Sequence, residues 1–457
     1  MRKVLVLVIL LAIGAAVTFV AAGFAAGPAI QIVRPAKFVG ASTPVEVAID
    51  TPAGLLTALR IEFEQNGVRT PVFALAGETT TTQAGSDRPD RVSLTRPIGT
   101  DNVPTLKSGA GRIIVTATRP VLFGLRAVET TAAHDVQVRL EKPRVSVLST
   151  HHYVNLGGSE VVVYRVTPAD VDSGVMVGDV EYPGYAAVGA RGDDVRITDP
   201  EIRMAFFALR HDQALTTPMH VFARDEAGNA ARATFDYRTF PKPFKRSRIE
   251  INDRLLERVV PAILAGTSDV KPSGSLIDQF VAINSELRRK NAEKIVSFAS
   301  QSSAEMLWQG AVFHPFTNSS AESAFADQRT YVYQGREVDK QVHLGFDLAS
   351  FAGTPIVAAN RGSVVFAEEL GIYGQCVIID HGMGVQSLYA HLSSIEVKPG
   401  AMVEKGQSIG RSGMTGLAGG DHLHFTMLVN GQMVNPIEWW DSHWIADRIL
   451  RKLKGAM

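Results

Sequence analysis

The first apolar stretch of the chain is an uncharged run from Val4 to about Ala26 that follows two basic residues. A helix of this length crosses a hydrocarbon core of about 30 Å. A basic start before an apolar run is an export signal that leaves the N-terminus inside. A cleaved signal has an apolar region of only about 7–15 residues, and no clear cleavage site follows this one. We therefore expect residues 1–29 to be an uncleaved membrane anchor, with a cleaved signal as the alternative.

Between about residues 30 and 240, apolar and polar residues alternate with a period of two, and turn signals separate the short runs. Two segments of about 100 residues with many short strands are typical of small β-sandwiches. The pattern predicts two Ig-like β-sandwich domains, over residues 30–145 and 146–240. Its clearest hairpin has strands at 219–224 and 233–237 around a polar loop.

The hydrophobic period becomes helical after a linker at residues 241–246. Asn252 or Asp253 can cap a short helix that runs to about Leu264, and Ser275 can cap a longer one. The pattern predicts a short helical linker region over residues 241–309.

From about residue 310 the chain is rich in glycine and short apolar runs. This composition predicts a turn-dense β domain over residues 310–445. Residues 446–457 indicate a short basic helix, which we expect to pack on its own domain. Contact with a membrane or a glycan is the alternative for that helix.

Composition and charge narrow the function classes. Lys+Arg and Asp+Glu both total 46, so the formal net charge is zero and no nucleic-acid partner is expected. The basic triplet 288–290 is expected to be a solvated helix face, with contact to an anionic wall or membrane polymer as the alternative. The single cysteine, Cys376, lies in an apolar run and is expected to be a buried, inert thiol.

The candidate chemistry lies in histidines of the glycine-rich domain. His422 and His424 are two apart, so on an extended strand both imidazoles point to one face. His343 and Asp347, four apart, can also return to one face. Two imidazoles and one carboxylate are a known catalytic zinc set that leaves a fourth position for water. The metal lowers the pKa of that water, and further neutral imidazoles can shuttle protons.

Three motifs in order extend this reading, namely His343-Leu-Gly-Phe-Asp347, Tyr389-Ala-His391 and Gly420-Asp-His422-Leu-His424. Over about residues 310–445 the chain resembles the M23 (lysostaphin-type, LytM-type) metallopeptidases. The resemblance implies that His343, Asp347 and His424 bind Zn²⁺. It also implies that His391 and His422 flank the bound water as general base and as oxyanion-stabilising donor, with either assignment open. His381 is expected to be structural.

The resemblance implies a zinc-dependent endopeptidase that hydrolyses the peptide cross-links of bacterial peptidoglycan. With the N-terminal helix, it places a single-pass protein in the cytoplasmic membrane with its bulk in the periplasm, where a typical target is a D-alanyl–diaminopimelate cross-link. The alternative is a non-catalytic LytM-type regulator that activates other cell-wall hydrolases, but such regulators lose metal ligands and all five positions are filled here. A wall-anchored structural protein is a further alternative.

The remaining expectations concern regulation. The β-sandwich domains are interpreted as spacers, brakes or docks for regulatory protein partners. In the family, segments upstream of the first ligand can cover the cleft. Asn318, or a neighbour within residues 313–340, is therefore a candidate inhibitory plug, with an ordinary loop or groove wall as the alternative.

Overall fold

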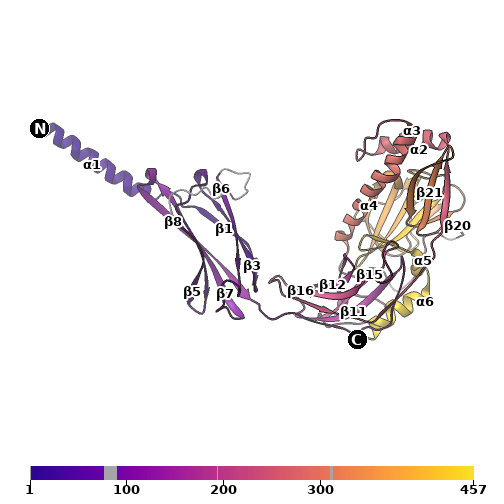
Figure 1. Cartoon of the computed structure of the whole chain (residues 1–457), viewed down its shortest axis with the longest axis horizontal. Coiled ribbons are helices and arrows are strands. Elements are labelled where there is room, and N and C mark those ends of the chain that lie inside the picture. Colours follow the sequence, from indigo (N-terminus) through magenta and orange to yellow (C-terminus); the bar gives the residue numbers. More distant parts are fainter. Residues whose placement is uncertain (1, 77–89, 193, 309–311, 317) are drawn as a thin grey trace. The chain divides into compact units, whose positions relative to one another are not determined.

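The chain is mainly β, with one apolar helix at its N-terminus (Figure 1). The computed structural model describes residues 2–76, 90–192, 194–308, 312–316 and 318–457. These residues form two compact units, Met1–Pro143 with Arg224–Ala230 and Arg144–Ala223 with Ala231–Met457. The expected mainly β fold class is confirmed, and each unit has hydrophobic core residues of its own.

Helix α1 (Arg2–Ala22) begins the first unit. Within it, the 20 residues of Lys3–Ala22 are long enough and apolar enough to cross a membrane. The expected apolar helix is therefore present, and its length and composition suit an anchor or a signal.

The rest of the first unit is a pair of sheets around one core. A three-stranded sheet has the order β1-β3-β6, and a five-stranded sheet has the order β2-β8-β7-β4-β5. Alternation along β3 turns Val45, Val47 and Ile49 inward, where they are fully buried against the other sheet. The strands are β1 (Ala29–Arg34), β2 (Phe38–Val39), β3 (Thr43–Asp50), β4 (Ala58–Gln65), β5 (Val68–Ala76), β6 (Arg91–Ile98), β7 (Gly109–Val121) and β8 (Arg126–Val138).

The second unit begins with another strand-rich region. Its sheets have the orders β14-β15-β11-β9 and β13-β12-β16-β17, with a further parallel pair, β10-β18. The strands are β9 (Arg144–Val147), β10 (His152–Asn155), β11 (Ser159–Thr167), β12 (Asp172–Val177), β13 (Val180–Pro183), β14 (Tyr185–Ala186), β15 (Ile202–Ala208), β16 (Met219–Arg224), β17 (Ala230–Ala233) and β18 (Tyr237–Phe240).

The predicted hairpin is present, but its second strand was placed wrongly. The strand after the loop is β17, and Tyr237 begins β18, which pairs with β10. The loop is tight because Asn229 N donates to Asp225 Oδ1 at 2.8 Å and Asp225 N donates to Asn229 O at 3.0 Å. The next strand therefore starts directly after Asn229.

The region that follows is helical, as expected, but it opens with a strand. Residues of the expected linker from Arg246 onward form β19 (Arg246–Ile251), which pairs in parallel with β21 (Asp327–Tyr333). Asn252 caps α2 (Asp253–Gly266), and Ser275 caps α3 (Leu276–Ala282) through a capping box with Asp278. Helix α3 continues through a π turn, Ile283–Leu287, into α4 (Arg288–Ser297).

An eight-stranded sheet forms the centre of the glycine-rich region. Its order is β20-β23-β31-β27-β26-β25-β29, and β32 pairs with β31. Smaller sheets have the orders β19-β21-β22 and β24-β30-β28. The strands not yet bounded are β20 (Ser320–Ser323), β22 (Arg336–His343), β23 (Phe346–Ala349), β24 (Pro355–Val357), β25 (Gly362–Glu369), β26 (Gln375–Gly382), β27 (Val385–Leu392), β28 (Ser394–Ile395), β29 (Met402–Val403), β30 (Ser408–Arg411), β31 (Leu423–Val429) and β32 (Gln432–Val434).

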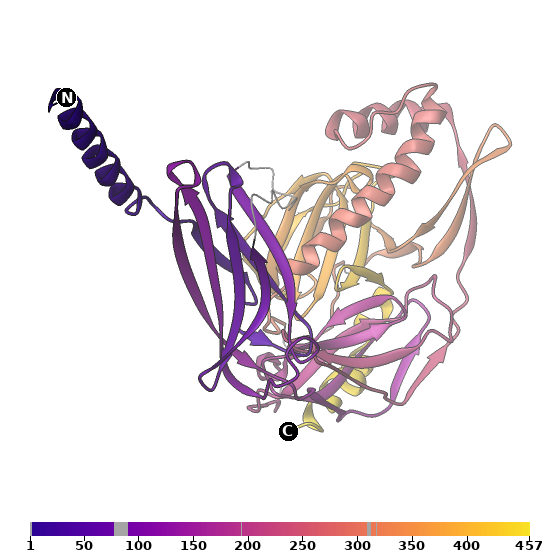
Figure 2. The ribbon, with the colours of Figure 1, turned by 60° about the vertical axis from the view of Figure 1, so that its left-hand side comes forward.

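Both faces of this central sheet are covered, so all eight residues of β27 are buried. On one face Leu388 packs in a cluster with Leu287 and Ile295 of the helical region, and Figure 2 shows that region lying across the sheet. On the other face Tyr389 belongs to a cluster that extends into the strand-rich region before it. Cys376 is fully buried, as expected, and burial raises the pKa of its thiol.

The chain ends in short helical turns, α5 (Pro436–Trp439), α6 (Ser442–Trp444), a π turn (Ile445–Leu450) and α7 (Arg451–Lys454). The expectation that this segment packs on its own domain is wrong in part. Lys452 Nζ donates to Glu160 Oε1 at 2.7 Å and to Val161 O at 3.0 Å, both on β11. The segment therefore joins the glycine-rich region to the strand-rich region before it.

Candidate active site

Three expected ligands meet where β22, β23 and β31 lie together. His343 is the last residue of β22, and Asp347 and His424 are directly paired across β23 and β31. His343 Nε2 lies 2.9 Å from Asp347 Oδ1 and 2.9 Å from His424 Nδ1. His424 Nδ1 lies 3.0 Å from Asp347 Oδ1. The structure thus brings the three side chains to one buried point, and they are a cluster able to hold a metal ion.

Gly345 makes this convergence sterically feasible. A Cβ atom at this position would lie 2.5 Å from His424 Nε2 and 2.8 Å from the carbonyl oxygen of Phe425. Because glycine has no side chain, it lets the ring of another residue approach the backbone closely. The glycine between His343 and Asp347 is therefore a steric part of the site.

The donor set of the cluster fits a divalent cation. His343 Nδ1 lies 3.2 Å from the carbonyl oxygen of Ala324, so Nδ1 carries the hydrogen and Nε2 presents a lone pair. Three electron-pair donors then face one another at about 3 Å, and a cation relieves their repulsion. Tetrahedral zinc bonds of about 2.0–2.1 Å place two ligand atoms about 3.3 Å apart, close to the separations here.

The pKa values of the ligands favour the forms that bind metals. Burial raises the pKa of Asp347, but the neighbouring His343, followed by His422 and His424, outweighs burial and holds this pKa well below its usual range. Burial lowers the pKa of His424 to about 4, against a hydrogen bond to Asp347 that raises it. An ionised carboxylate and a neutral imidazole are the states that metal binding requires.

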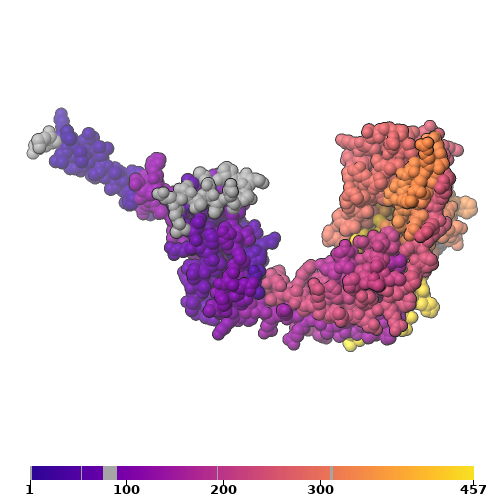
Figure 3. Space-filling model, viewed as in Figure 1, coloured from indigo at the N-terminus to yellow at the C-terminus, as the bar shows by residue number. Residues whose placement is uncertain are grey.

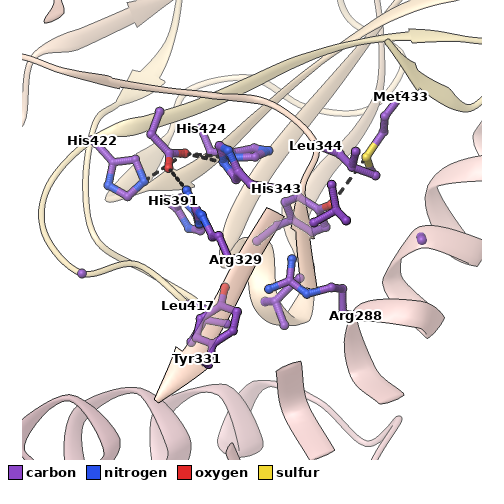
Figure 4. Close-up of a pocket in the computed structure, with 16 residues that line it drawn as sticks. Arg288, Arg329, Tyr331, His343, Leu344, His391, Leu417, His422, His424 and Met433 are labelled. Atoms are coloured by element: carbon purple, nitrogen blue, oxygen red, sulfur yellow. Dashed lines mark hydrogen bonds and ion pairs between the residues drawn. The ribbon is translucent and has the colours of Figure 1, made fainter. Parts of the chain in front are cut away.

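His391 and His422 lie beside the ligands, with rings 4.9 Å apart (Figure 4). His391 Nδ1 donates to Thr415 O at 2.8 Å, and His422 Nδ1 donates to Gly420 O at 2.9 Å. Each ring therefore keeps Nε2 for the pocket, and that of His422 lies 3.5 Å from Asp347 Oδ1. His391 has φ +62°, a strained conformation of the kind that clusters at functional sites.

The two rings differ in the direction of their pKa shift. Burial, reinforced by the charges of His422 and His424, lowers the pKa of His391 well below its usual value. Burial also opposes protonation of His422, but the hydrogen bond and charge of Asp347 outweigh it and raise that pKa.

Arg329 contacts a ligand that sequence reasoning did not connect with it. Its Nη2 lies 3.0 Å from Asp347 Oδ2 and 2.8 Å from Ser323 Oγ. Ser323 Oγ in turn lies 3.3 Å from His343 Nδ1. Arg329 precedes Asp347 by 18 residues without a motif around it, so only the fold reveals the contact.

Asn318 does not line this pocket, whose walls include Arg288, Arg329, Tyr331 and Tyr373. The carbonyl oxygen of Asn318 instead accepts a hydrogen bond from Ser350 Oγ at 3.5 Å. The geometry therefore gives no support to Asn318 as a plug over the ligands.

His381 is fully buried and away from the pocket lining. Its Nδ1 donates to Arg361 O at 2.8 Å, and its Nε2 lies 2.7 Å from Ser387 Oγ. Burial lowers its pKa to about 4. Both nitrogens are engaged inside the protein, which agrees with the structural role expected for it.

Comparison with known proteins agrees with this geometry. The sequence profile described as Peptidase family M23 matches residues 341–436. Residues 341–436 form an M23 peptidase domain. The M23 domain contains all five expected site residues, whereas Arg288 and Arg329 lie before it.

Two curated relatives match this domain. DD-carboxypeptidase/endopeptidase Mpg of Neisseria meningitidis is 43% identical over 97 residues, which are 21% of this chain and 22% of that protein. Peptidoglycan DD-endopeptidase ShyA of Vibrio cholerae is 42% identical over 96 residues, again 21% and 22% of the two chains. The chain therefore spans about a fifth of the length of these relatives.

Among solved structures, the catalytic domain of lysostaphin from Staphylococcus simulans is 28% identical to this chain. The match covers 26% of this chain and 90% of that one, with a TM-score of 0.23.

Proposed function

We propose that the chain is a zinc-dependent endopeptidase that hydrolyses peptide cross-links of bacterial peptidoglycan. The observation that carries the proposal is the convergence of His343 Nε2, Asp347 Oδ1 and His424 Nδ1 within 3.0 Å of one another. The M23 domain and the endopeptidase functions of Mpg and ShyA support the reaction class and the substrate.

In this proposal His343, Asp347 and His424 hold the zinc ion. When bound, zinc supplies a Lewis acid that lowers the pKa of water and polarises a carbonyl group. Arg329 donates a hydrogen bond to Asp347 Oδ2, which leaves Oδ1 directed toward the two imidazoles. Burial of the ligands excludes bulk water and strengthens electrostatic interactions at this point.

His391 and His422 handle protons in the proposed reaction. Their Nδ1 atoms are fixed on backbone carbonyls, so each Nε2 is directed into the pocket. One Nε2 can accept the proton of the attacking water, and the other can donate a hydrogen bond to the oxygen that becomes negative in the transition state. The second nitrogen of each ring sets its tautomer and orientation, which is pre-organisation for this role.

We further propose that α1 anchors the protein in the cytoplasmic membrane and that the rest of the chain lies in the periplasm. The 20-residue apolar helix and the peptidoglycan-acting relatives support this placement. The β-sandwich domains expected at 30–145 and 146–240 are then spacers, brakes or docks for regulatory proteins.

Two histidine variants separate metal binding from proton transfer. His424→Ala should lose both zinc and hydrolysis, because it removes a ligand. His391→Ala should keep zinc and lose roughly 10²–10⁴-fold in rate, because it removes only an acid–base group. Metal content by mass spectrometry and the loss of cross-linked muropeptides from purified sacculi measure the two effects. The exposed His443→Ala serves as the matched control.

Wild-type activity in His391→Ala would contradict the proposed roles. A folded wild-type chain that binds no zinc and leaves the cross-linking of sacculi unchanged would instead favour the regulator that activates other hydrolases.

A further inference from the structure

One wall of the catalytic pocket comes from a helix that precedes the M23 domain. Arg288 is the first residue of α4 and lines the same pocket as the five site residues. It directly follows the π turn Ile283–Leu287, a distortion that is frequent at functional sites. Figure 4 shows its guanidinium pointing from the helix toward the pocket. The helical region therefore contributes a charged group to the site.

Neutral partners hold this guanidinium in place. Arg288 Nε donates to Asn284 O at 3.0 Å, and Nη2 donates to Asn284 Oδ1 at 2.6 Å. Asn284 is fully buried, and its own amide donates to Asp339 Oδ2 at 2.7 Å. The rotamer of Arg288 is thus fixed by a buried amide rather than by a carboxylate.

Among the described residues, the two basic neighbours of Arg288 pair with carboxylates, unlike Arg288 itself. Arg289 pairs with Glu293 at 2.5 Å and Lys290 pairs with Glu286 at 3.0 Å on the helix surface. Within the described part of the chain, no carboxylate lies within 4.0 Å of the Arg288 side-chain nitrogens. The expectation of a solvated basic face therefore suits its neighbours, whereas Arg288 turns into the pocket.

Arg288 lies close to the ligand cluster. Tyr373 lines the pocket with it, and the Tyr373 ring is 5.6 Å from that of His424. Burial raises the pKa of Tyr373 to about 12, and the nearby charge of Arg288 opposes that rise. A group bound by Arg288 would therefore lie in the same pocket as the proposed reaction centre.

We propose that Arg288 binds a free carboxylate on the substrate residue next to the scissile amide, and that it selects cross-links that carry this acid. The inference rests on the proposed endopeptidase function. Arginine presents a planar fork of donors that matches a carboxylate in a bidentate way. A cross-link made through one amino group of a diamino diacid has such a carboxylate on the carbon that bears the amide nitrogen. Arg288 is thus a specificity residue for the leaving-group side.

The test compares two substrates and three forms of the full chain. The substrates are cross-linked muropeptide dimers in which the carboxylate beside the cross-link is either free or amidated. The proteins are the wild type, Arg288→Gln and the matched surface control Arg289→Gln. For the wild type, kcat/KM should be about 10- to 100-fold higher on the free-acid dimer than on the amidated dimer. This factor is the size expected of one charge-assisted hydrogen-bonded contact. Arg288→Gln should lose this factor on the free acid alone, and Arg289→Gln should keep it.

Several outcomes would overturn the inference. A wild type without preference for the free acid contradicts it even if every variant fails to fold. An equal fall on both substrates in Arg288→Gln would show a purely structural role, and an unchanged preference would show no role. A zinc-loaded wild type that cleaves neither dimer overturns the proposed function itself, and the inference with it.

Discussion

At the scale of single residues, the proposed metal ligands contact a second set of side chains that lies before the M23 domain. Arg329 Nη2 contacts Asp347 Oδ2 and Ser323 Oγ, and Ser323 Oγ lies within 3.3 Å of His343 Nδ1. Such partners orient ligands and commonly contribute 10–100-fold to metal affinity. Residues 320–329 therefore belong to the site although no catalytic group lies among them.

Replacement of Arg329 by methionine tests this support. The variant leaves Asp347 Oδ2 without its cation, so zinc affinity should fall about 10–100-fold. Competition with a chromogenic chelator measures the affinity without reference to activity. Arg336→Met, at the exposed start of β22, is the control. Equal affinities for wild type and Arg329→Met would refute the supporting role.

Replacement of Gly345 by alanine tests the steric requirement. The new Cβ would lie 2.5 Å from His424 Nε2, so the ring must leave its position and zinc affinity should fall. Gly455→Ala, whose nearest non-local atom would be 3.4 Å away, should have little effect. Zinc titration of both variants decides the question, and tight zinc binding by Gly345→Ala would speak against this steric reading.

At the scale of elements, sequence patterns predicted the parts of the site that lie within continuous segments. The spacing of His422 and His424, and of His343 and Asp347, suggested a shared point, and strand pairing between β23 and β31 brings Asp347 and His424 together. Arg288 and Arg329 carry no comparable signal, because the pairing of β19 with β21 and the packing of the π turn Ile283–Leu287 beside β22 bring them in from distant sequence. Figure 3 shows the orange atoms of the region around β21 and β22 beside the salmon atoms of the helical region.

The predicted helix caps were correct for the same local reason. Asn252 and Ser275 accept hydrogen bonds from backbone groups three residues later. The second strand of the 219–237 hairpin was placed wrongly, because loop closure between Asp225 and Asn229 depends on side-chain contacts that a period of two does not encode.

Helix α5 contains a buried acid that links the M23 domain to the preceding strand-rich region. Glu438 accepts hydrogen bonds from Asn155 Nδ2 at 2.9 Å and from Ser159 N at 2.8 Å. Burial raises its pKa from 4.5 to about 7, and the nearby charge of Glu160 adds to the rise. The folded chain therefore binds a proton that the unfolded chain releases between about pH 4.5 and 7.

This proton linkage predicts the direction in which the free energy of unfolding changes with pH. The contribution of Glu438 is fully present below about pH 4.5 and is lost as the pH rises to about 7. Relative to wild type, Glu438→Gln should therefore gain stability as the pH rises from 5 to 7.5. Urea unfolding of both proteins at the two pH values measures this difference. The exposed Glu257→Gln is the control, and a difference that does not change with pH would count against the linkage.

At the scale of the whole molecule, the second unit combines the M23 domain with elements outside it. The buried pair of Lys452 and Glu160, at 2.7 Å, joins the C-terminal turns to β11. The proposed metal ligands lie on strands whose apolar core residues form clusters of their own. The fold of this unit should therefore survive loss of the metal, while its free energy of unfolding should fall.

Removal of zinc by a chelator tests this expectation. An ion that binds only the folded state adds stability that grows with its concentration, about 4 kcal/mol at 1,000 times the dissociation constant. Chelation should lower the Tm while the far-ultraviolet circular dichroism at room temperature stays the same. An unchanged Tm in the full chain would argue against a metal at this site.

The most direct test of the proposed endopeptidase is the identity of the products from peptidoglycan. Purified sacculi would be digested with the full zinc-loaded chain in detergent, and the muropeptides would be analysed by liquid chromatography and mass spectrometry. The proposal predicts that cross-linked dimers decrease, that uncross-linked monomers with intact glycan increase, and that His391→Ala abolishes the change. Unchanged cross-linking after digestion by the folded, zinc-loaded wild type would contradict it.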